Sequence, residues 1–173
     1  MMKYKELNQM LMRNKKVPYP QIPRLYPNKR YANLIYESFA GKEGELTAVN
    51  QYIYEHIDFK DKEDISKILL DVAIEEMHHL EILGDILVNL GEKPLFKDSN
   101  QKDWNANNVQ YKIKDIKEAM KINISSEETA IREYRQLMRY TNNMYLRRVY
   151  ERIILDETTH LEIFKRILED CKN

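Results

Sequence analysis

The sequence EEMHHLEI at residues 75–82 decides the fold, and a partial copy of it, DETTHLEI, occupies residues 156–163. Each copy contains Glu-x-x-His followed by Leu-Glu-Ile. Residues three apart on a helix share one face, so each copy can offer one carboxylate oxygen and one imidazole nitrogen to the same metal ion. Two copies on two helices therefore predict two metal ions.

Hydrophobic periodicity selects one residue from each doublet of the first copy. In a helix expected over residues 62–90, apolar side chains at positions 69, 72, 83, 86 and 90 form one stripe. Glu76 and His79 occupy the two remaining positions of that stripe. Glu75 and His78 are displaced by about 100° per residue, so we expect them to point away from the core.

The second copy repeats this pattern. A helix is expected to start near Asn142 or Asn143, either of which can cap it, and to extend towards residue 169. Apolar side chains at positions 146, 150, 153, 164 and 167 enclose Glu157 and His160. We expect the side chain of Asp156, like that of Glu75, to point away from the core.

Two further acids lie among core residues of the other two expected helices, residues 31–57 and 113–140. They are Glu45 and Glu127; the alternative to the latter, Glu128, aligns with a more polar face. Gly41 and Gly44 each cost a helix interior roughly 1 kcal/mol relative to alanine, so they mark a kink or a close helix approach.

The two halves of the chain are internal repeats. Residues 45–52 and residues 127–134 both read Glu-x-x-Ala-x-x-x-Tyr, and the acid lies at nearly the same distance from the following Glu-x-x-His histidine in both halves. The sequence therefore predicts two copies of one helical hairpin, one in each half of the chain.

Four carboxylates converging on a bundle core would repel one another and cost several kcal/mol per ion if left unpaired. No lysine or arginine lies on the four stripes near these acids. Two iron or manganese ions would balance the charge, whereas the lack of thiolate ligands argues against structural zinc. The expected ligands are Glu45 and Glu127 as terminal carboxylates, Glu76 and Glu157 as bridging or semi-bridging carboxylates, and His79 and His160 as nitrogen ligands.

Two tyrosines are candidate catalytic residues of this site. Tyr52 and Tyr134 each lie two helical turns beyond a terminal acid, where the phenol can donate to a metal-bound carboxylate across the bundle. The alternative interpretation is a packing role. Ala48 and Ala130 leave space for the cluster, and Asn123 is a candidate neighbour of the third-helix acid.

Composition excludes several classes of protein. Lys+Arg and Asp+Glu both number 28, which gives no support for a nucleic-acid partner. The single cysteine, Cys171, excludes an internal disulfide and favours a cytoplasmic setting. Apolar runs are too short to cross a membrane, and the start does not resemble a signal peptide.

The chain divides into an N-terminal arm, residues 1–30, and a four-helix bundle, residues 31–173. Residues 1–16 can form a short amphipathic helix, and residues 17–27 are proline-rich and expected to be extended. Residues 91–112 are long enough for a crossover along the bundle, with Trp104 as its packing anchor.

At these residues the chain resembles the ferritin-like superfamily, specifically its rubrerythrin and manganese-catalase branch and small clostridial-type catalase-like proteins. The strings AIEEMHHLEILGDIL, ERIILDETTHLEIF, GELTAVNQY and WNANNVQY carry the resemblance, which covers about residues 30 to 170. It implies an all-α, antiparallel four-helix bundle with a long crossover between the second and third helices, and a homo-oligomer. In manganese catalases the fourth-helix acid can be outer-sphere, so Glu157 is the least secure ligand.

The resemblance implies an oxidoreductase that acts on hydrogen peroxide or dioxygen. Manganese would permit catalase chemistry without a reductant, whereas iron would require an external electron donor for peroxidase chemistry, because the four cysteines of a rubredoxin domain are absent. The alternatives are an iron-binding protein with a ferroxidase centre, and a structural coat or stress protein that retains the metal site.

Overall fold

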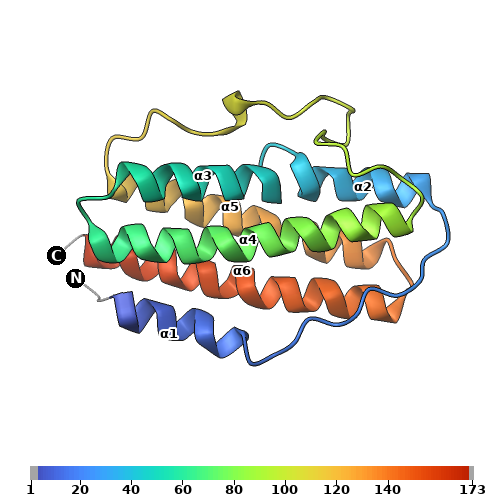
Figure 1. Cartoon of the computed structure of the whole chain (residues 1–173), viewed down its shortest axis with the longest axis horizontal. Helices are drawn as coiled ribbons and strands as arrows, with labels where there is room; N and C mark the ends of the chain where they lie inside the picture. Colours follow the sequence, from blue (N-terminus) through green and yellow to red (C-terminus); the bar gives the residue numbers. More distant parts are fainter. Residues whose placement is uncertain (1–3, 172–173) are drawn as a thin grey trace.

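The computed structural model describes residues 4–171, which form a helical bundle as predicted (Figure 1). Helices α2 and α3 lie in line with each other, and together they run alongside α4, α5 and α6. The helices are α1 (Tyr4–Asn14), α2 (Lys29–Ala40), α3 (Glu45–Asp58), α4 (Glu63–Asn89), α5 (Ile116–Arg139) and α6 (Met144–Asp170), with a 3-10 turn, η1 (Ala106–Asn108).

Polar side chains and one glycine set the helix ends. Asn28 accepts a hydrogen bond from the first turn of α2, Asp115 does so for α5, and Asn143 accepts two at the start of α6. Gly91 follows α4 with a φ of 84°, the left-handed conformation that ends many helices. Both the expected cap of the fourth helix and the expected glycine stop are confirmed.

The prediction of one helix over residues 31–57 is wrong, because the chain breaks between α2 and α3. A Cβ atom on Gly41 would lie 2.4 Å from the carbonyl oxygen of Glu37, and one on Gly44 would lie 2.6 Å from the same atom. The two glycines therefore allow a close backbone approach that no larger residue permits. The break makes Glu45 the first residue of α3, where the helix dipole favours a negative charge.

The bundle core consists of two apolar clusters, one on each side of a polar middle. On α4, Ile65 to Ala73 contribute to one cluster and Ile82 to Leu90 to the other, while Glu76 and His79 lie between them. The same order holds on α6, whose Leu146 to Ile153 and Ile163 to Ile167 flank Glu157 and His160. The polar groups thus lie midway along the bundle.

The long crossover runs along the side of α2 and α3 (Figure 1). Trp104 packs against the core and donates a hydrogen bond from Nε1 to Oγ1 of Thr47, at 2.9 Å. The backbone N–H of Gln110 donates to Gln51 at 2.7 Å. The expected anchoring role of Trp104 is confirmed, and the crossover covers α3 directly.

The N-terminal segment is held against the opposite side of the bundle. Helix α1 packs on α4 and α6, and the hydroxyl of Tyr4 donates to Asp71 at 2.7 Å. Residues 15–28, here called the strap, then run along the bundle to the start of α2 (Figure 1). The division into an arm and a bundle domain at residue 30 stays a prediction.

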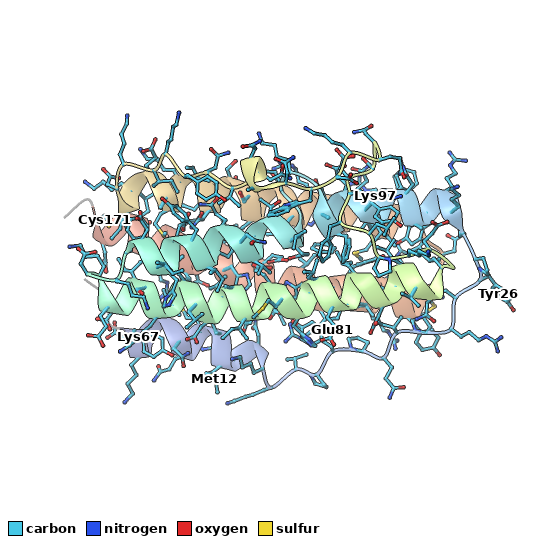
Figure 2. All side chains as sticks on the ribbon, turned by 45° about the horizontal axis from the view of Figure 1, so that its top comes forward. Met12, Tyr26, Lys67, Glu81, Lys97 and Cys171 are labelled. Atoms are coloured by element: carbon cyan, nitrogen blue, oxygen red, sulfur yellow. The ribbon has the colours of Figure 1, made fainter. Side chains whose placement is uncertain are left out.

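Charged side chains cover the outside of the bundle. Figure 2 shows Lys67 and Glu81 of α4 at the periphery, together with Tyr26 of the strap. Tyr26 is 91% exposed. Within residues 4–171, each helix is too short or too polar to cross a membrane.

Candidate dinuclear metal site

The six predicted ligands come together in the polar middle of the bundle. Each is at most 4% exposed, although four of them are acids. Helix α3 supplies Glu45, α5 supplies Glu127, and α4 and α6 each supply a Glu-x-x-His pair. The choice of the inward residues was correct for α5 as well, because the neighbouring Glu128 lies at the surface and pairs with Lys165 at 3.3 Å.

One group of donors surrounds the imidazole of His79. Its Nδ1 lies 3.0 Å from Oε2 of Glu76, 3.2 Å from Oε1 of Glu157 and 3.8 Å from Oε2 of Glu45. A neutral imidazole carries one ring N–H, so a single proton cannot satisfy three carboxylate oxygens. This half of the cluster has the donors of a metal position.

A second group surrounds His160 in the same way. Its Nδ1 lies 2.9 Å from Oε1 of Glu76, 3.1 Å from Oε2 of Glu157 and 3.9 Å from Oε2 of Glu127. Glu76 and Glu157 thus present one oxygen to each histidine, whereas Glu45 and Glu127 each face one. In each group of four residues the donor atoms lie within 4.8 Å of one another.

The outer nitrogens of the two histidines meet acids that we expected to point away. Oε2 of Glu75 lies 2.9 Å from Nε2 of His160, and Oδ2 of Asp156 lies 3.3 Å from Nε2 of His79. Both acids are buried, so the expectation for them was wrong. A residue 100° away from the core stripe of α4 faces α6, and the reverse holds for α6. His78, in contrast, is exposed as expected.

The two phenols also pair across the bundle. The Tyr52 hydroxyl on α3 donates to Oε1 of Glu127 on α5 at 2.5 Å, and the Tyr134 hydroxyl on α5 donates to Glu45 on α3. We expected Asn123 to be a neighbour of Glu127, but its Nδ2 donates a hydrogen bond to Glu55 at 2.6 Å.

Burial and mutual repulsion make the cluster hold protons when no metal is bound. Burial, followed by the charge of Glu76, raises the pKa of Glu45 to about 7. Burial also raises the pKa of Glu127 well above its usual range. Burial opposes the charged form of His79 and His160, yet the surrounding carboxylates raise the pKa of both imidazoles. The cluster of six side chains therefore strongly favours a bound positive charge, whether protons or metal ions.

Two oxygens test whether metal ions fit. Oε1 of Glu76 and Oε1 of Glu157 are buried without a hydrogen-bond partner among residues 4–171. The Nδ1 atom of each histidine instead forms its hydrogen bond with Oε2 of the glutamate three residues before it, His79 with Glu76 and His160 with Glu157. A buried carboxylate oxygen without a partner is costly. With Nδ1 free to ligate, Nε2–H of each histidine still has its carboxylate acceptor. The donor set fits two divalent iron or manganese ions.

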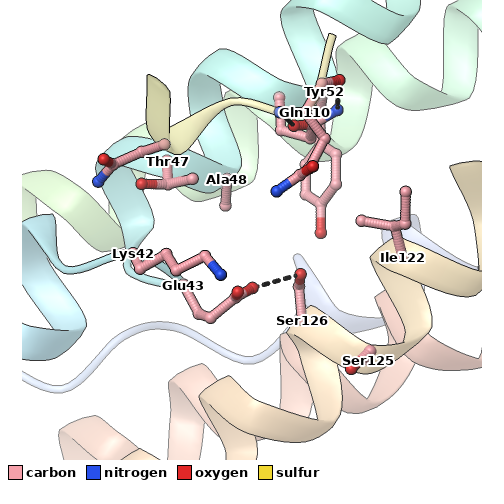
Figure 3. Close-up of a pocket in the computed structure, with 11 residues that line it drawn as sticks. Lys42, Glu43, Thr47, Ala48, Tyr52, Gln110, Ile122, Ser125 and Ser126 are labelled. Carbon is pink, nitrogen blue, oxygen red and sulfur yellow. Dashed lines mark hydrogen bonds between the residues drawn. The ribbon is translucent and has the colours of Figure 1, made fainter. Parts of the chain in front are cut away.

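A surface pocket reaches towards this cluster between α3 and α5. It has a volume of about 310 Å³ and is bounded by the crossover at Asn108 and Gln110. Figure 3 shows Tyr52 on one wall, and Lys42, Glu43 and Ser126 around the rest. Because the Tyr52 hydroxyl bonds to Glu127, one side chain separates the pocket from a predicted ligand.

Sequence reasoning missed a further buried acid, Glu55. It accepts hydrogen bonds from Gln51 at 2.9 Å and from Asn123 at 2.6 Å, and burial raises its pKa to about 7. It lies one helical turn beyond Tyr52 on α3. The signal was available, since a seam traced one turn further along α3 reaches this residue.

A bundle with a Glu from each of two helices and Glu-x-x-His from each of the other two defines the class of dinuclear metal carboxylate proteins. Within this class, the family described as manganese-containing catalase matches residues 10–96, half of the chain. The chain belongs to that family. The predicted resemblance is thereby confirmed.

Individual relatives agree with this assignment. A probable manganese catalase of Clostridium acetobutylicum is 29% identical over 84% of this chain and 73% of its own length. The crystal structure of wild-type KatB, a manganese catalase from Anabaena, superposes with a TM-score of 0.80 at 25% identity, covering 90% of this chain and 77% of that one.

A bacterioferritin is also similar. The Desulfovibrio desulfuricans protein is 28% identical over 75% of this chain and 70% of its own length. A crystal structure of that bacterioferritin has a TM-score of 0.69 at 23% identity, covering 83% of this chain and 81% of that one. The fold is therefore the predicted ferritin-like bundle.

Proposed function

We propose that this protein is a dinuclear manganese enzyme that converts two molecules of hydrogen peroxide into one dioxygen and two water molecules. The ligands are the six residues predicted from the sequence: Glu45, Glu76, His79, Glu127, Glu157 and His160. The observation that carries the proposal is the placement of Glu76 and Glu157, each with one oxygen beside each histidine. This arrangement suits two carboxylates that bridge a pair of metal ions.

The reaction needs two electrons to be removed from one peroxide and given to the next, and a pair of manganese ions supplies this capacity when bound. The protein supplies the surroundings. Tyr52 holds Oε1 of Glu127 and Tyr134 holds Oε1 of Glu45, which leaves Oε2 of each acid directed at the histidines. Fixed carboxylates keep the two positions at a constant separation.

Substrate reaches the site through the pocket between α3 and α5. Its walls carry hydroxyl, amide and charged groups, which suits a small polar molecule such as peroxide. Apolar clusters close the bundle on both sides of the metal positions and exclude bulk water from them. This exclusion protects reactive species from side reactions.

The test is oxygen evolution from peroxide by protein loaded with manganese and given no reductant. We expect activity from the native protein and its loss in Glu76→Gln, which keeps the side-chain shape but removes the bridging charge. Glu128→Gln, a surface acid beside a terminal ligand, is the matched control and should remain active. Native protein that carries two manganese ions and evolves no oxygen would contradict the proposal.

An iron-handling role is the second candidate, favoured by the match to a bacterioferritin. Carboxylate and imidazole ligands suit iron as well as manganese. In that case the native protein should oxidise added Fe²⁺ with dioxygen, again through Glu76. Comparing Fe²⁺ oxidation with peroxide disproportionation in the same preparation decides between the two.

A further inference from the structure

The strap places a tyrosine behind the metal site, on the side away from the pocket. The Tyr19 hydroxyl lies 3.0 Å from Nε2 of His79 and donates a hydrogen bond to Asp156. This oxygen is closer to the histidine than the Asp156 carboxylate is, at 3.3 Å. The guanidinium of Arg152 lies 4.2 Å from the centre of the Tyr19 ring.

Further bonds tie the strap to the same carboxylate. Arg152 forms an ion pair with Asp156 and donates from Nε to the carbonyl oxygen of Val17, at 2.7 Å. Asn14, the last residue of α1, donates from Nδ2 to Oδ1 of Asp156 at 3.0 Å. Asp156 is thus held in place by Arg152 on its own helix, by Asn14 of α1 and by Tyr19 of the strap.

The other histidine has a simpler environment. Nε2 of His160 lies 2.9 Å from Oε2 of Glu75, and that acid pairs with Lys15, at 3.8 Å, whose side chain is 48% exposed. This acid is therefore less firmly fixed than Asp156.

We propose that Tyr19 is a positioning residue for the metal position formed by Glu45 and His79, and that the strap makes this position bind its metal more firmly than the position of Glu127 and His160. The inference rests on the proposed dinuclear site. A hydrogen-bonded Nε2–H fixes the ring of a ligating histidine and makes its Nδ1 a better donor. Among residues 4–171, Nε2 of His79 has two such acceptors, Tyr19 of the strap and Asp156, which Tyr19 and Arg152 hold, whereas Nε2 of His160 has one, Glu75.

The test is Mn²⁺ titration of the metal-free full-length protein by equilibrium dialysis, with electron paramagnetic resonance to distinguish coupled pairs from isolated ions. We expect two unequal affinities in the native protein. Tyr19→Phe should weaken the tighter one about tenfold and bring the two together, as is typical for the loss of a residue that supports a metal ligand. Tyr4→Phe, which removes a hydroxyl of α1 that bonds Asp71 and Asn8, is the matched control and should leave both affinities unchanged.

Glu75→Gln supplies the opposite test, because it should weaken the other, looser position and widen the difference. Asp156→Asn, run in parallel, removes charge from the same partner of His79 and should reproduce the selective loss even if Tyr19→Phe does not fold. Equal native affinities, or equal weakening of both positions by Tyr19→Phe and Asp156→Asn, would overturn the inference alone. Native protein that binds no pair of Mn²⁺ ions would overturn the proposed function as well.

Discussion

Four of the six predicted ligands are each contacted by a residue from the other half of the chain. Tyr52 holds Glu127 and Tyr134 holds Glu45; Glu75 contacts His160 and Asp156 contacts His79. The internal repeat accounts for this reciprocity, because two equivalent hairpins that face each other exchange equivalent contacts.

The Tyr134 hydroxyl provides a prediction at this scale. Tyr134→Phe should lower the peroxide turnover number about tenfold, because Glu45 loses the hydrogen bond that fixes its orientation. Tyr31→Phe also removes a buried hydroxyl, one that bonds Leu137 and Tyr150, and is the control for stability. Both variants should lose about 1 kcal/mol of unfolding free energy. Equal turnover in the two variants would show that the phenol has a packing role only.

At the scale of helices, periodicity predicted α4, α5 and α6 and the six residues that converge, because apolar stripes are strict in a bundle core. It could not predict the burial of Glu75 and Asp156. Their positions lie outside the core stripe, and they are buried because α4 and α6 face one another beneath α1 and the strap. Gly41 and Gly44 predicted a kink or a close helix approach, whereas the full break between α2 and α3 depends on contacts with the Glu37 carbonyl that side-chain periodicity does not encode.

The gap between α3 and α5 provides a prediction for a pair of elements. Ala48 lines the pocket, so Ala48→Leu should narrow the route to the site and lower kcat/KM for peroxide more than it lowers kcat. Ala106→Leu adds the same volume on the exposed η1 turn and should change neither constant. Stopped-flow oxygen measurements over a range of peroxide concentrations would separate them. A fall in kcat alone would place the entry route elsewhere.

At the scale of the whole molecule, the charged middle of the bundle couples stability to pH. In the metal-free protein, burial and the charge of Glu76 raise the pKa of Glu45 from 4.5 to about 7. As pH rises, Glu45 therefore loses its proton in the unfolded state before it does so in the folded state. The free energy of unfolding falls as the pH rises between these two pKa values. The raised pKa values of His79 and His160 act in the same direction, because their stabilising protons are lost at high pH.

We therefore expect the melting temperature of metal-free protein to fall as pH rises from about 5 to about 8, with saturating Mn²⁺ reversing the trend. Metal binding requires deprotonated ligands, so its stabilising effect grows with pH. Differential scanning calorimetry at matched ionic strength would measure both curves. A metal-free protein that becomes more stable over this range would contradict the electrostatic description.

The shared placement of Glu76 and Glu157 has a consequence for the ancestry of the chain. A single hairpin, α3 with α4, carries Glu45, Glu76 and His79 but lacks Glu157, the second acid with one oxygen beside each histidine, which comes from α6. Two copies of one hairpin related by a twofold axis would contain the complete set of donors. A half-length chain of this design would therefore assemble the same set of donors as a homodimer.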